Sequence, residues 1–356
     1  MNLLEPPIAR LTPWQREISG IAAALRERFS ATAPMGSSSS MLWWGAGYSD
    51  LLSSCSDQIS RDVVFADNDP RRLRRSKAMA GEDARTVRLL ALADLRRDTT
   101  GVESALKSIT LRDIDSYLAF EDKLLHRFQD SPAVADGWAG VVVMDFILNR
   151  VGADAEALVL AEAFRAVQRE GCVLSVMLVA DEPTDAQPVK SAPPGPALRL
   201  PTERDVLRAF ERTGFHGLRM HWSAAENPLA IDRIGGVDVR MCIVEAYRGK
   251  QGPCLELGQA VIYAGPWSEV RDDDGHVYRR GERVAVCAKT YDLLMRAPYQ
   301  GQLTGLRSAS EPLLEQALPF DCNTPALRDP KVTKGLAPFM GSRSSASACD
   351  PESGCC

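Results

Sequence analysis

The hydrophobic positions from residue 41 to residue 180 fall into short, continuous apolar runs separated by segments with helical spacing. Runs of this length predict strands that are covered on both faces. The strand candidates are MLWWG (41–45), DVVFAD (62–67), TVRLLALAD (86–94), GVVVMDFIL (140–148) and CVLSVMLVA (172–180). The helix candidates between them lie at about 49–56, 70–80, 102–130 in two pieces, and 153–169. Strands that alternate with helices predict an α/β fold with a doubly wound, mostly parallel sheet.

The pattern differs on both sides of this region. Residues 1–40 combine helical spacing of apolar residues in PWQREISGIAAALRERF with the Ser-rich segment APMGSSSS, so we expect a helical lead-in and a linker. Beyond the last strand, Gly214 is expected to end a helix at 202–213, and GLRMHW (217–222) predicts one more strand.

After about residue 235 the pattern changes to alternating segments with turn residues between them. The stretch 259–287 predicts two or three strands, with DDDG at 272–275 as a tight turn. The last part is rich in Pro and Ser, weakly periodic, and ends in SACDPESGCC, which is typical of an extended tail. We therefore divide the chain into a lead-in and linker (1–40), an α/β domain (41–234), a β-rich C-terminal module (235–307) and a tail (308–356).

Composition narrows the class of protein. A chain of 356 residues with 45% hydrophobic and 25% charged residues is typical of a globular protein with one large domain or two ordinary ones. The net charge of −5 gives no reason to expect a nucleic-acid partner, and the basic run RRLRRSK (71–77) is interpreted as the solvated face of a helix. No apolar stretch predicts a membrane span, and the polar N-terminus does not read as a signal peptide. We therefore expect a cytoplasmic protein without a membrane partner, whose nine cysteines are mostly thiols.

The segment MLWWGAGYSD has the outline of a strand, a glycine turn and a helix that binds a nucleotide. Gly45 and Gly47 would let the backbone pass close to a ligand. Asp67 ends the next strand candidate, where an acid accepts hydrogen bonds from ribose hydroxyls, and Asp94 ends the third candidate at the same edge of the sheet. The alternative is that Asp67, Asp69 and Asp94 are ordinary helix-cap and turn acids.

The cysteines are the second group of candidate residues. Cys349, Cys355 and Cys356 lie close to the C-terminus, and because thiolates capture soft ions they are candidate ligands for a soft metal or metalloid. The alternative is that this tail is incidental. Five further cysteines are interpreted as residues of the core or of the β-rich module: Cys55, Cys172, Cys242, Cys254 and Cys287. The four histidines have no metal-ligand spacing, and no nucleophile elbow, P-loop or metalloprotease motif occurs, so no catalytic residue is identified.

Two segments of the C-terminal half strongly resemble the C-terminal module of bacterial arsenite methyltransferase-like proteins. They are EAYRGKQGPCLELGQAVIYAGPWSEVRDDDGHVYRRGERVAVCAKTYDLL (245–294) and PFDCNTPALRDPKVTKG (319–335). A tail that ends in a cysteine pair is also usual in that family. The upstream half resembles the family more loosely, at FILNRV (146–151), EAFRAVQREGCVLSVMLVADEP (162–183) and ALRLPTERDVLRAFERTGFHGLRM (197–220). The resemblance covers about residues 40 to 335.

The resemblance implies a class I S-adenosylmethionine-dependent methyltransferase fold, with a seven-stranded sheet and the cofactor S-adenosylmethionine across its carboxyl edge. By this resemblance Gly45, Ala46 and Gly47 match the loop that passes the methionine part of the cofactor. Asp67 matches the acid that binds the ribose, and Asp94 is expected near the adenine. Cysteine thiolates bind trivalent arsenic in that family, so the resemblance implies a small-molecule or metalloid acceptor.

The chain also departs from the family's pattern. Its loop reads LWWGAGYSD where the family has D-L-G-C-G-x-G, Phe146 stands where the family has a cysteine, and APPGPAL contains no cysteine. Two functions therefore stay open. One is an S-adenosylmethionine-dependent methyltransferase that acts on trivalent arsenic or another soft or thiol-bound substrate, favoured by Gly45, Gly47 and Asp67. The other is a non-catalytic methyltransferase-fold paralogue that acts as a binding or interaction protein, favoured by the bulky tryptophan pair in the cofactor strand.

Overall fold

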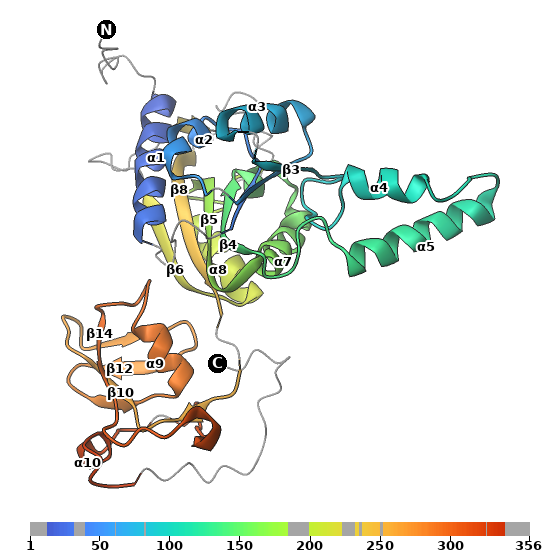
Figure 1. Cartoon of the computed structure of the whole chain (residues 1–356). Helices are drawn as coiled ribbons and strands as arrows, with labels where there is room; N and C mark the ends of the chain where they lie inside the picture. Colours follow the sequence, from blue (N-terminus) through green and yellow to red (C-terminus); the bar gives the residue numbers. More distant parts are fainter. Residues whose placement is uncertain are drawn as a thin grey trace. The chain divides into compact units, whose positions relative to one another are not determined.

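The chain forms two compact units that divide between Arg248 and Gly249 (Figure 1). The computed structural model describes residues 13–31, 40–60, 62–81, 83–183, 199–222, 232–234, 237–249, 252–324 and 326–338. Within these ranges no helix combines the length and the apolar character that a membrane crossing requires.

A mixed β-sheet forms the centre of the first unit. Its strand order is β3-β2-β1-β4-β5-β8-β6, and the short strand β7 also pairs with β8. The strands from β3 to β5 are parallel to their neighbours, whereas β8 is antiparallel to both β5 and β6. This order is that of the class I methyltransferase fold, which confirms the predicted fold class. The strands are β1 (Met41–Trp44), β2 (Val63–Asp67), β3 (Arg85–Arg88), β4 (Ala139–Asp145), β5 (Val167–Ala180), β6 (Phe215–Trp222), β7 (Asp232–Ile234) and β8 (Val237–Arg248).

Helices cover both faces of this sheet, and strand β1 shows why its sequence is apolar throughout. Successive side chains of a strand point to opposite faces. Trp43 packs against Phe29 of α1 with ring centroids 6.4 Å apart, whereas Trp44 belongs to the core cluster on the other face together with Phe210 of α8. Both tryptophans are fully buried. The helices are α1 (Pro13–Ala31), α2 (Leu51–Ser54), α3 (Pro70–Ala80), α4 (Thr99–Leu106), α5 (Ile114–Asp130), α6 (Ile147–Arg150), α7 (Glu156–Ala166) and α8 (Glu203–Thr213).

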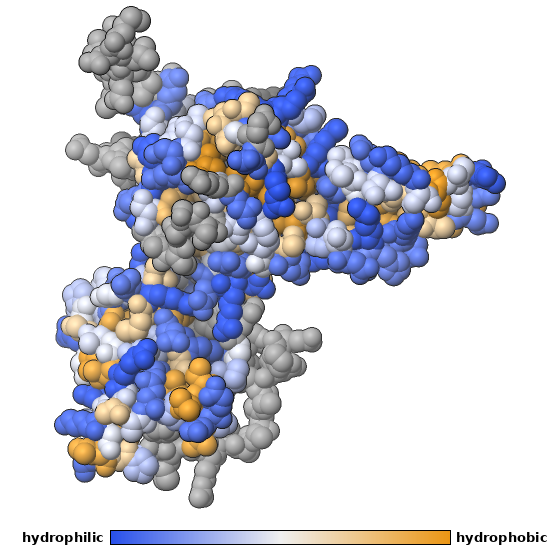
Figure 2. All heavy atoms as spheres, in the orientation of Figure 1, coloured by the Kyte–Doolittle hydropathy of each residue, from blue (hydrophilic) through white to orange (hydrophobic). Residues whose placement is uncertain are grey.

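Helices α4 and α5 form a hairpin that extends away from the sheet (Figure 1). Asp113 caps α5 by accepting a hydrogen bond from the amide of Ser116, at 2.8 Å. Ile114, Leu118 and Leu125 of α5 remain exposed, and apolar spheres are visible along the hairpin in Figure 2. The predicted pair of helices between 102 and 130 is therefore present, but only part of its apolar surface is used in the core.

Two strands end earlier than their apolar runs predict. Strand β3 ends at Arg88 rather than at residue 94, because Leu89 and Leu95 are buried from a turn instead of from a continuing strand. Strand β4 ends at Asp145, and Phe146 adopts a left-handed conformation (φ 56°) before the short helix α6. An apolar run does not by itself establish a buried strand: Leu89 is buried, whereas Leu90 in the same run is 47% exposed.

Strand β8 belongs to the large sheet, although its pattern places residues from 235 onward in the C-terminal module. It pairs with β5 from Cys172↔Tyr247 to Ala180↔Val239, and with β6 along its other edge. The units therefore divide after Arg248 rather than after residue 234. Strand β8 belongs to the large sheet because it pairs with β5 and β6, which lie far away in the sequence, and a local pattern does not reveal such partners.

The second unit consists of small β-sheets and short helices, as predicted for the β-rich module. One sheet has the order β13-β10-β14, and β11–β12 and β9–β15 form two-stranded pairs. Residues from 308 onward, predicted as tail, contain β15 and α10 and pack on this unit, for example through the hydrogen bond from the Ala309 amide to the Thr333 carbonyl (3.0 Å). The elements are β9 (Leu255–Glu256), β10 (Ala260–Tyr263), β11 (Glu269–Arg271), β12 (Val277–Arg279), β13 (Arg283–Ala285), α9 (Ala288–Leu294), β14 (Leu303–Leu306), β15 (Leu318–Pro319) and α10 (Pro330–Thr333).

A buried ion pair ties two segments of the second unit together. Arg328 donates from Nη2 to both carboxylate oxygens of Glu256, at 2.8 and 2.9 Å, and from Nε to the carbonyl of Gln259 at 3.2 Å. Both charged side chains are almost fully buried. Because a buried charge without its partner is costly, this pair holds the chain beyond β15 against β9.

Replacing Arg328 by Leu should destabilise the second unit by about 3–5 kcal/mol, because Glu256 would remain buried without its cation. Native-state hydrogen exchange of peptides covering 255–263 should report the loss as faster exchange. The matched control is Arg279→Leu, which removes an exposed pair with Glu269 (3.4 Å) and should cost less than about 1 kcal/mol. Equal exchange in the two variants would contradict the role given to Arg328.

Candidate functional site

The chain turns sharply after β1, at the carboxyl edge of the first sheet. Gly45 (φ 89°) and Gly47 (φ 75°) both adopt left-handed conformations that favour glycine. A Cβ at Gly45 would lie 2.7 Å from the carbonyl oxygen of Asp145, so the turn also packs closely against the end of β4. Ala46 between the glycines is fully buried in the core cluster that contains α1 residues. The predicted glycine turn is therefore present, with its alanine directed into the core.

Asp67 lies beside this turn, because β1 and β2 are neighbours and Trp44 pairs with Ala66. Its carboxylate is fully buried. Oδ1 accepts a hydrogen bond from the Asp69 amide at 2.7 Å, and Oδ2 accepts one from Nη2 of Arg150 at 3.0 Å. Both oxygens of the predicted ribose acid are therefore bonded to groups of the protein itself.

The Arg150 guanidinium lies between the glycine turn and Asp67. Its Nη1 would be 3.0 Å from a Cβ at Gly45, and its central carbon lies 4.2 Å from the centroid of the Tyr48 ring. The side chain is only 7% exposed. Burial lowers the pKa of Arg150 from its ordinary value, and the charge of Asp67 acts in the opposite direction. Nη1 has no hydrogen-bond partner within the residues that the structure describes.

The other acids near this edge serve local turns. Asp69 caps α3 by accepting from the Arg71 amide at 2.8 Å. Asp94 lies beyond the end of β3, accepts from the Arg96 amide at 2.9 Å and pairs with Arg97 at 3.2 Å. For Asp94 the structure shows the contacts of a turn acid rather than an acid at a strand end.

Asp145 is a buried acid of this edge that the sequence analysis does not single out. It ends β4, and its Oδ1 accepts a hydrogen bond from the Ser49 hydroxyl at 2.7 Å. Burial raises the pKa of Asp145 to about 6, although the Ser49 hydrogen bonds act in the opposite direction. This contact ties the glycine turn to β4. An acid inside the apolar run 140–148 is the signal that could have identified it.

The residues at this edge, as arranged, do not fit S-adenosylmethionine. Nucleotide cofactors on such sheets need a clear path past the glycine turn and free acceptors on the ribose acid. The Arg150 side chain lies in the path past the glycine turn, and its Nη2 donates a hydrogen bond to the carboxylate of Asp67. The sequence elements of a cofactor site are therefore present, but they are occupied by a side chain of the same chain.

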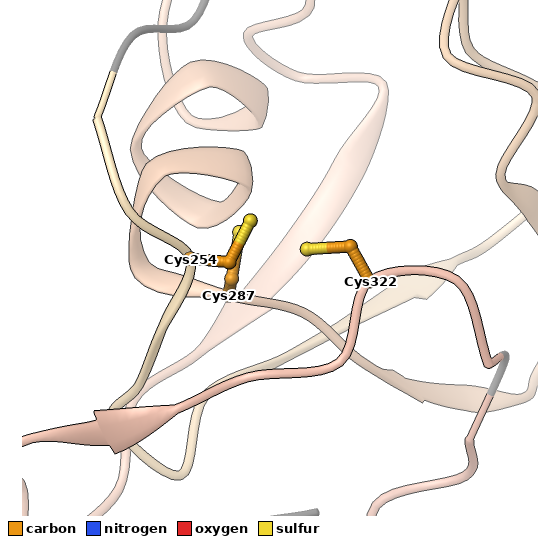
Figure 3. A group of neighbouring side chains, drawn as sticks. All are labelled: Cys254, Cys287 and Cys322. Carbon is orange, nitrogen blue, oxygen red and sulfur yellow. The ribbon is translucent and has the colours of Figure 1, made fainter. Parts of the chain in front are cut away.

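A cluster of three thiols lies in the second unit (Figure 3). The sulfur atoms of Cys254, Cys287 and Cys322 all lie within 4.8 Å of one another. Cys287 is fully buried and Cys254 is 9% exposed, whereas Cys322 is partly exposed. Cys349, Cys355 and Cys356, the predicted soft-ion ligands, lie outside the described residues.

Backbone pairing brings these cysteines together from three separate segments. The Phe320 amide donates to the Cys254 carbonyl at 2.8 Å, which extends the β9–β15 pair and places Cys322 just beyond it. The chain then runs along β13, where the Ala285 amide donates to the carbonyl of Ala326 at 2.9 Å. Cys287 lies two residues beyond the end of β13, at the start of α9, and contacts the Thr290 hydroxyl at 3.1 Å. No short motif links the three residues, which is why sequence reasoning did not group them.

Two of the three cysteines line a pocket with mostly apolar walls. Besides Cys287 and Cys322, the pocket is lined by His276, Val277, Tyr278, Val284, Ala285, Val286, Thr290, Phe320 and Thr324. The cysteines of the first unit differ, because Cys55, Cys172 and Cys242 are buried in its core. Burial raises the pKa of Cys55 to about 11 and also raises that of Cys242, so these two thiols are poor ligands.

A comparison with protein-family models agrees with the division of the chain into two units after Arg248. Residues 250–338 match a family model described as "Domain of unknown function (DUF8838)", which falls within the second unit. The comparison with curated proteins gives no match.

Solved structures of methyltransferases are similar to the chain at low identity. An arsenic (III) S-adenosylmethionine methyltransferase from Chlamydomonas reinhardtii is 16% identical, with 80% of this chain and 89% of that chain covered and a TM-score of 0.40. The 1,6-didemethyltoxoflavin-N1-methyltransferase of Burkholderia thailandensis is 13% identical, with 67% and 81% covered and a TM-score of 0.40. The geranyl diphosphate C-methyltransferase of Streptomyces coelicolor A3(2) is 9% identical, with 64% and 79% covered and a TM-score of 0.41. Such low similarity does not carry a function from one protein to another.

The raised pKa of Asp145 predicts a measurable dependence of stability on pH. The native state holds this proton more tightly than the unfolded chain, whose ordinary value is 3.8, so the stabilisation is complete below that value and is lost as the pH rises through about 6. Asp145→Asn removes the titration and keeps the shape. The free energy of unfolding of the wild type, relative to this variant, should therefore fall by roughly 2 kcal/mol from about pH 4 to about pH 7.

Urea unfolding at the two pH values, followed by circular dichroism, measures this difference. Asp50→Asn, at an exposed acid of the same turn, is the control. A difference between wild type and Asp145→Asn that stays constant with pH would contradict the assignment.

Proposed function

We propose that the first unit is a non-catalytic form of the methyltransferase fold and that the protein acts by binding rather than by methyl transfer. The observation that carries this proposal is the Arg150 guanidinium, which lies between Gly45 and Asp67. A cofactor at this edge would have to displace a buried ion pair. Breaking such a pair leaves Asp67 buried without its closest cation, which is strongly unfavourable.

The surroundings of Arg150 support a stable arrangement. The guanidinium stacks on Tyr48, and Tyr48 is itself positioned by the turn through its amide, which donates to the Gly45 carbonyl at 3.1 Å. Arg72 also approaches Asp67, with Nη1 3.4 Å from Oδ1. Two cations therefore lie beside the acid that would have to receive the ribose, and both lie over the Tyr48 ring.

The second candidate is S-adenosylmethionine-dependent methyl transfer to trivalent arsenic or another soft or thiol-bound acceptor. It is favoured by the glycine turn and by Asp67 at adjacent strand ends. It is also favoured by Nη1 of Arg150, a buried donor without a partner in the described part of the chain, which would suit the carboxylate of the cofactor's methionine part. This candidate requires Arg150 to exchange Asp67 for the ligand.

Calorimetric titration with S-adenosylmethionine separates the two candidates. The wild type should show no saturable heat up to millimolar cofactor. Arg150→Leu removes the guanidinium from the edge. Its Kd for the cofactor should be at least roughly tenfold below the lower limit measured for the wild type, equivalent to about 1.4 kcal/mol. Arg75→Leu is the control, because Arg75 is exposed and pairs only with Asp50 in the residues described. Unfolding temperatures establish that each variant is folded.

Tight binding by the wild type, with loss of binding in Asp67→Ala, would overturn the non-catalytic proposal and leave methyl transfer as the function. If neither the wild type nor Arg150→Leu binds, the protein is non-catalytic toward this cofactor for a reason other than Arg150.

A further inference from the structure

The three-thiol cluster of the second unit is a set of soft donors that the first unit's chemistry does not use. Cys254, Cys287 and Cys322 come from separate segments, and their sulfur atoms lie within 4.8 Å of one another (Figure 3). The backbone ladders on both sides of Cys322 hold it in place, at Cys254 and at Ala285. The buried Glu256–Arg328 pair holds the same two segments together.

The spacing of the sulfur atoms suits one central ion. A thiolate ligand lies about 2.3 Å from an ion such as zinc, so neighbouring sulfur atoms around one ion are about 3.8 Å apart. Bringing the cluster to this spacing requires each pair of sulfur atoms to close by about 1 Å or less. The partly exposed Cys322 offers an approach from solvent, and it lines the same pocket as Cys287.

The number of donors favours an ion that is satisfied by three sulfurs. Among the described residues no histidine, aspartate or glutamate joins the cluster. His276 lines the pocket, but its ring nitrogens do not belong to the group of ligand atoms that lie within 4.8 Å of one another around the three sulfur atoms. Structural zinc takes four protein ligands, which this set does not supply. A trivalent metalloid forms three bonds and carries a lone pair in the remaining direction.

Charge favours the same ion. Three thiolates around a trivalent centre are neutral, whereas a divalent or monovalent ion would leave one or two negative charges. Cys287 is fully buried, and the pocket beside it is lined by Val277, Val284, Val286 and Phe320. Uncompensated charge in such surroundings is costly, so a neutral complex is preferred.

We propose that Cys254, Cys287 and Cys322 bind a trivalent metalloid of the arsenite or antimonite class. Binding exchanges three hydroxides for three sulfurs: As(OH)₃ + 3 Cys–SH → As(S–Cys)₃ + 3 H₂O. Three As–O and three S–H bonds break, three As–S and three O–H bonds form, and no atom changes its oxidation state. The site lies in the second unit, so it does not depend on whether S-adenosylmethionine binds to the first.

The test is titration of the reduced, full-length protein with arsenite under anaerobic conditions. One arsenic should bind per chain, with near-ultraviolet absorption from sulfur–arsenic bonds. Calorimetry in two buffers of different ionisation heat should show no net proton release, because the thiol protons leave as water. Zinc offered to the same thiols would release about three protons. Tighter binding of zinc than of arsenite would overturn the assignment of a trivalent ion.

Variants locate the site. Cys322→Ser changes the most accessible of the three cysteines and should weaken arsenite binding by more than the roughly 10- to 100-fold that losing a supporting group costs a metal site. The matched control replaces Cys349, Cys355 and Cys356 together by Ser and should bind arsenite like the wild type. As a second measurement, arsenite should raise the unfolding temperature of the wild type and of the control but not that of Cys322→Ser. Unchanged binding in Cys322→Ser, or loss of binding in the control alone, would overturn the proposal.

Discussion

Compensation of buried charge is the constraint on which both units depend. Asp67 is fully buried at the end of β2 and is held by Arg150, which comes from the end of α6. Glu256 is buried at the end of β9 and is held by Arg328 from the segment beyond β15. Transfer of a charge out of water costs several kcal/mol unless the charge is paired. Each buried acid therefore requires an arginine side chain from a distant segment to lie beside it. Each arginine in turn positions its own segment, α6 against the glycine turn in one unit and the chain beyond β15 against β9 in the other.

In the first unit, the sheet edge where ligands bind in this fold is occupied by a side chain of the protein itself. The sheet order places a glycine turn and an acid side by side at the carboxyl edge, where open α/β sheets bind their ligands. A guanidinium satisfies the acid as well as a ribose hydroxyl does, and it also stacks on Tyr48. In the proposed non-catalytic form, one side chain at the end of a four-residue helix makes this edge unavailable to a cofactor. The fold restricts where function can lie, and the residues at the edge determine which function it is.

The second unit applies the same constraint to a different chemistry. Neutral thiols are tolerated beside apolar walls, so Cys254, Cys287 and Cys322 can lie close together without a compensating cation. The need for compensation arises only when the thiols are ionised, and the proposed trivalent centre would meet it within the cluster. Whatever the first unit binds, the two sites rest on separate groups of residues.

The apolar pattern by itself determined the α/β class, the places of most strands and helices, the glycine turn after β1 and the acid at the end of β2, because periodicity and burial are local properties of the chain. It did not determine that Asp94 follows a turn, that β8 joins the large sheet, or that three cysteines meet, because each depends on which distant segment a residue pairs with. The role of Arg150 is of the same kind. An arginine soon after a strand looks like a surface residue in the sequence, and only the packing of α6 against the sheet edge turns it onto Asp67.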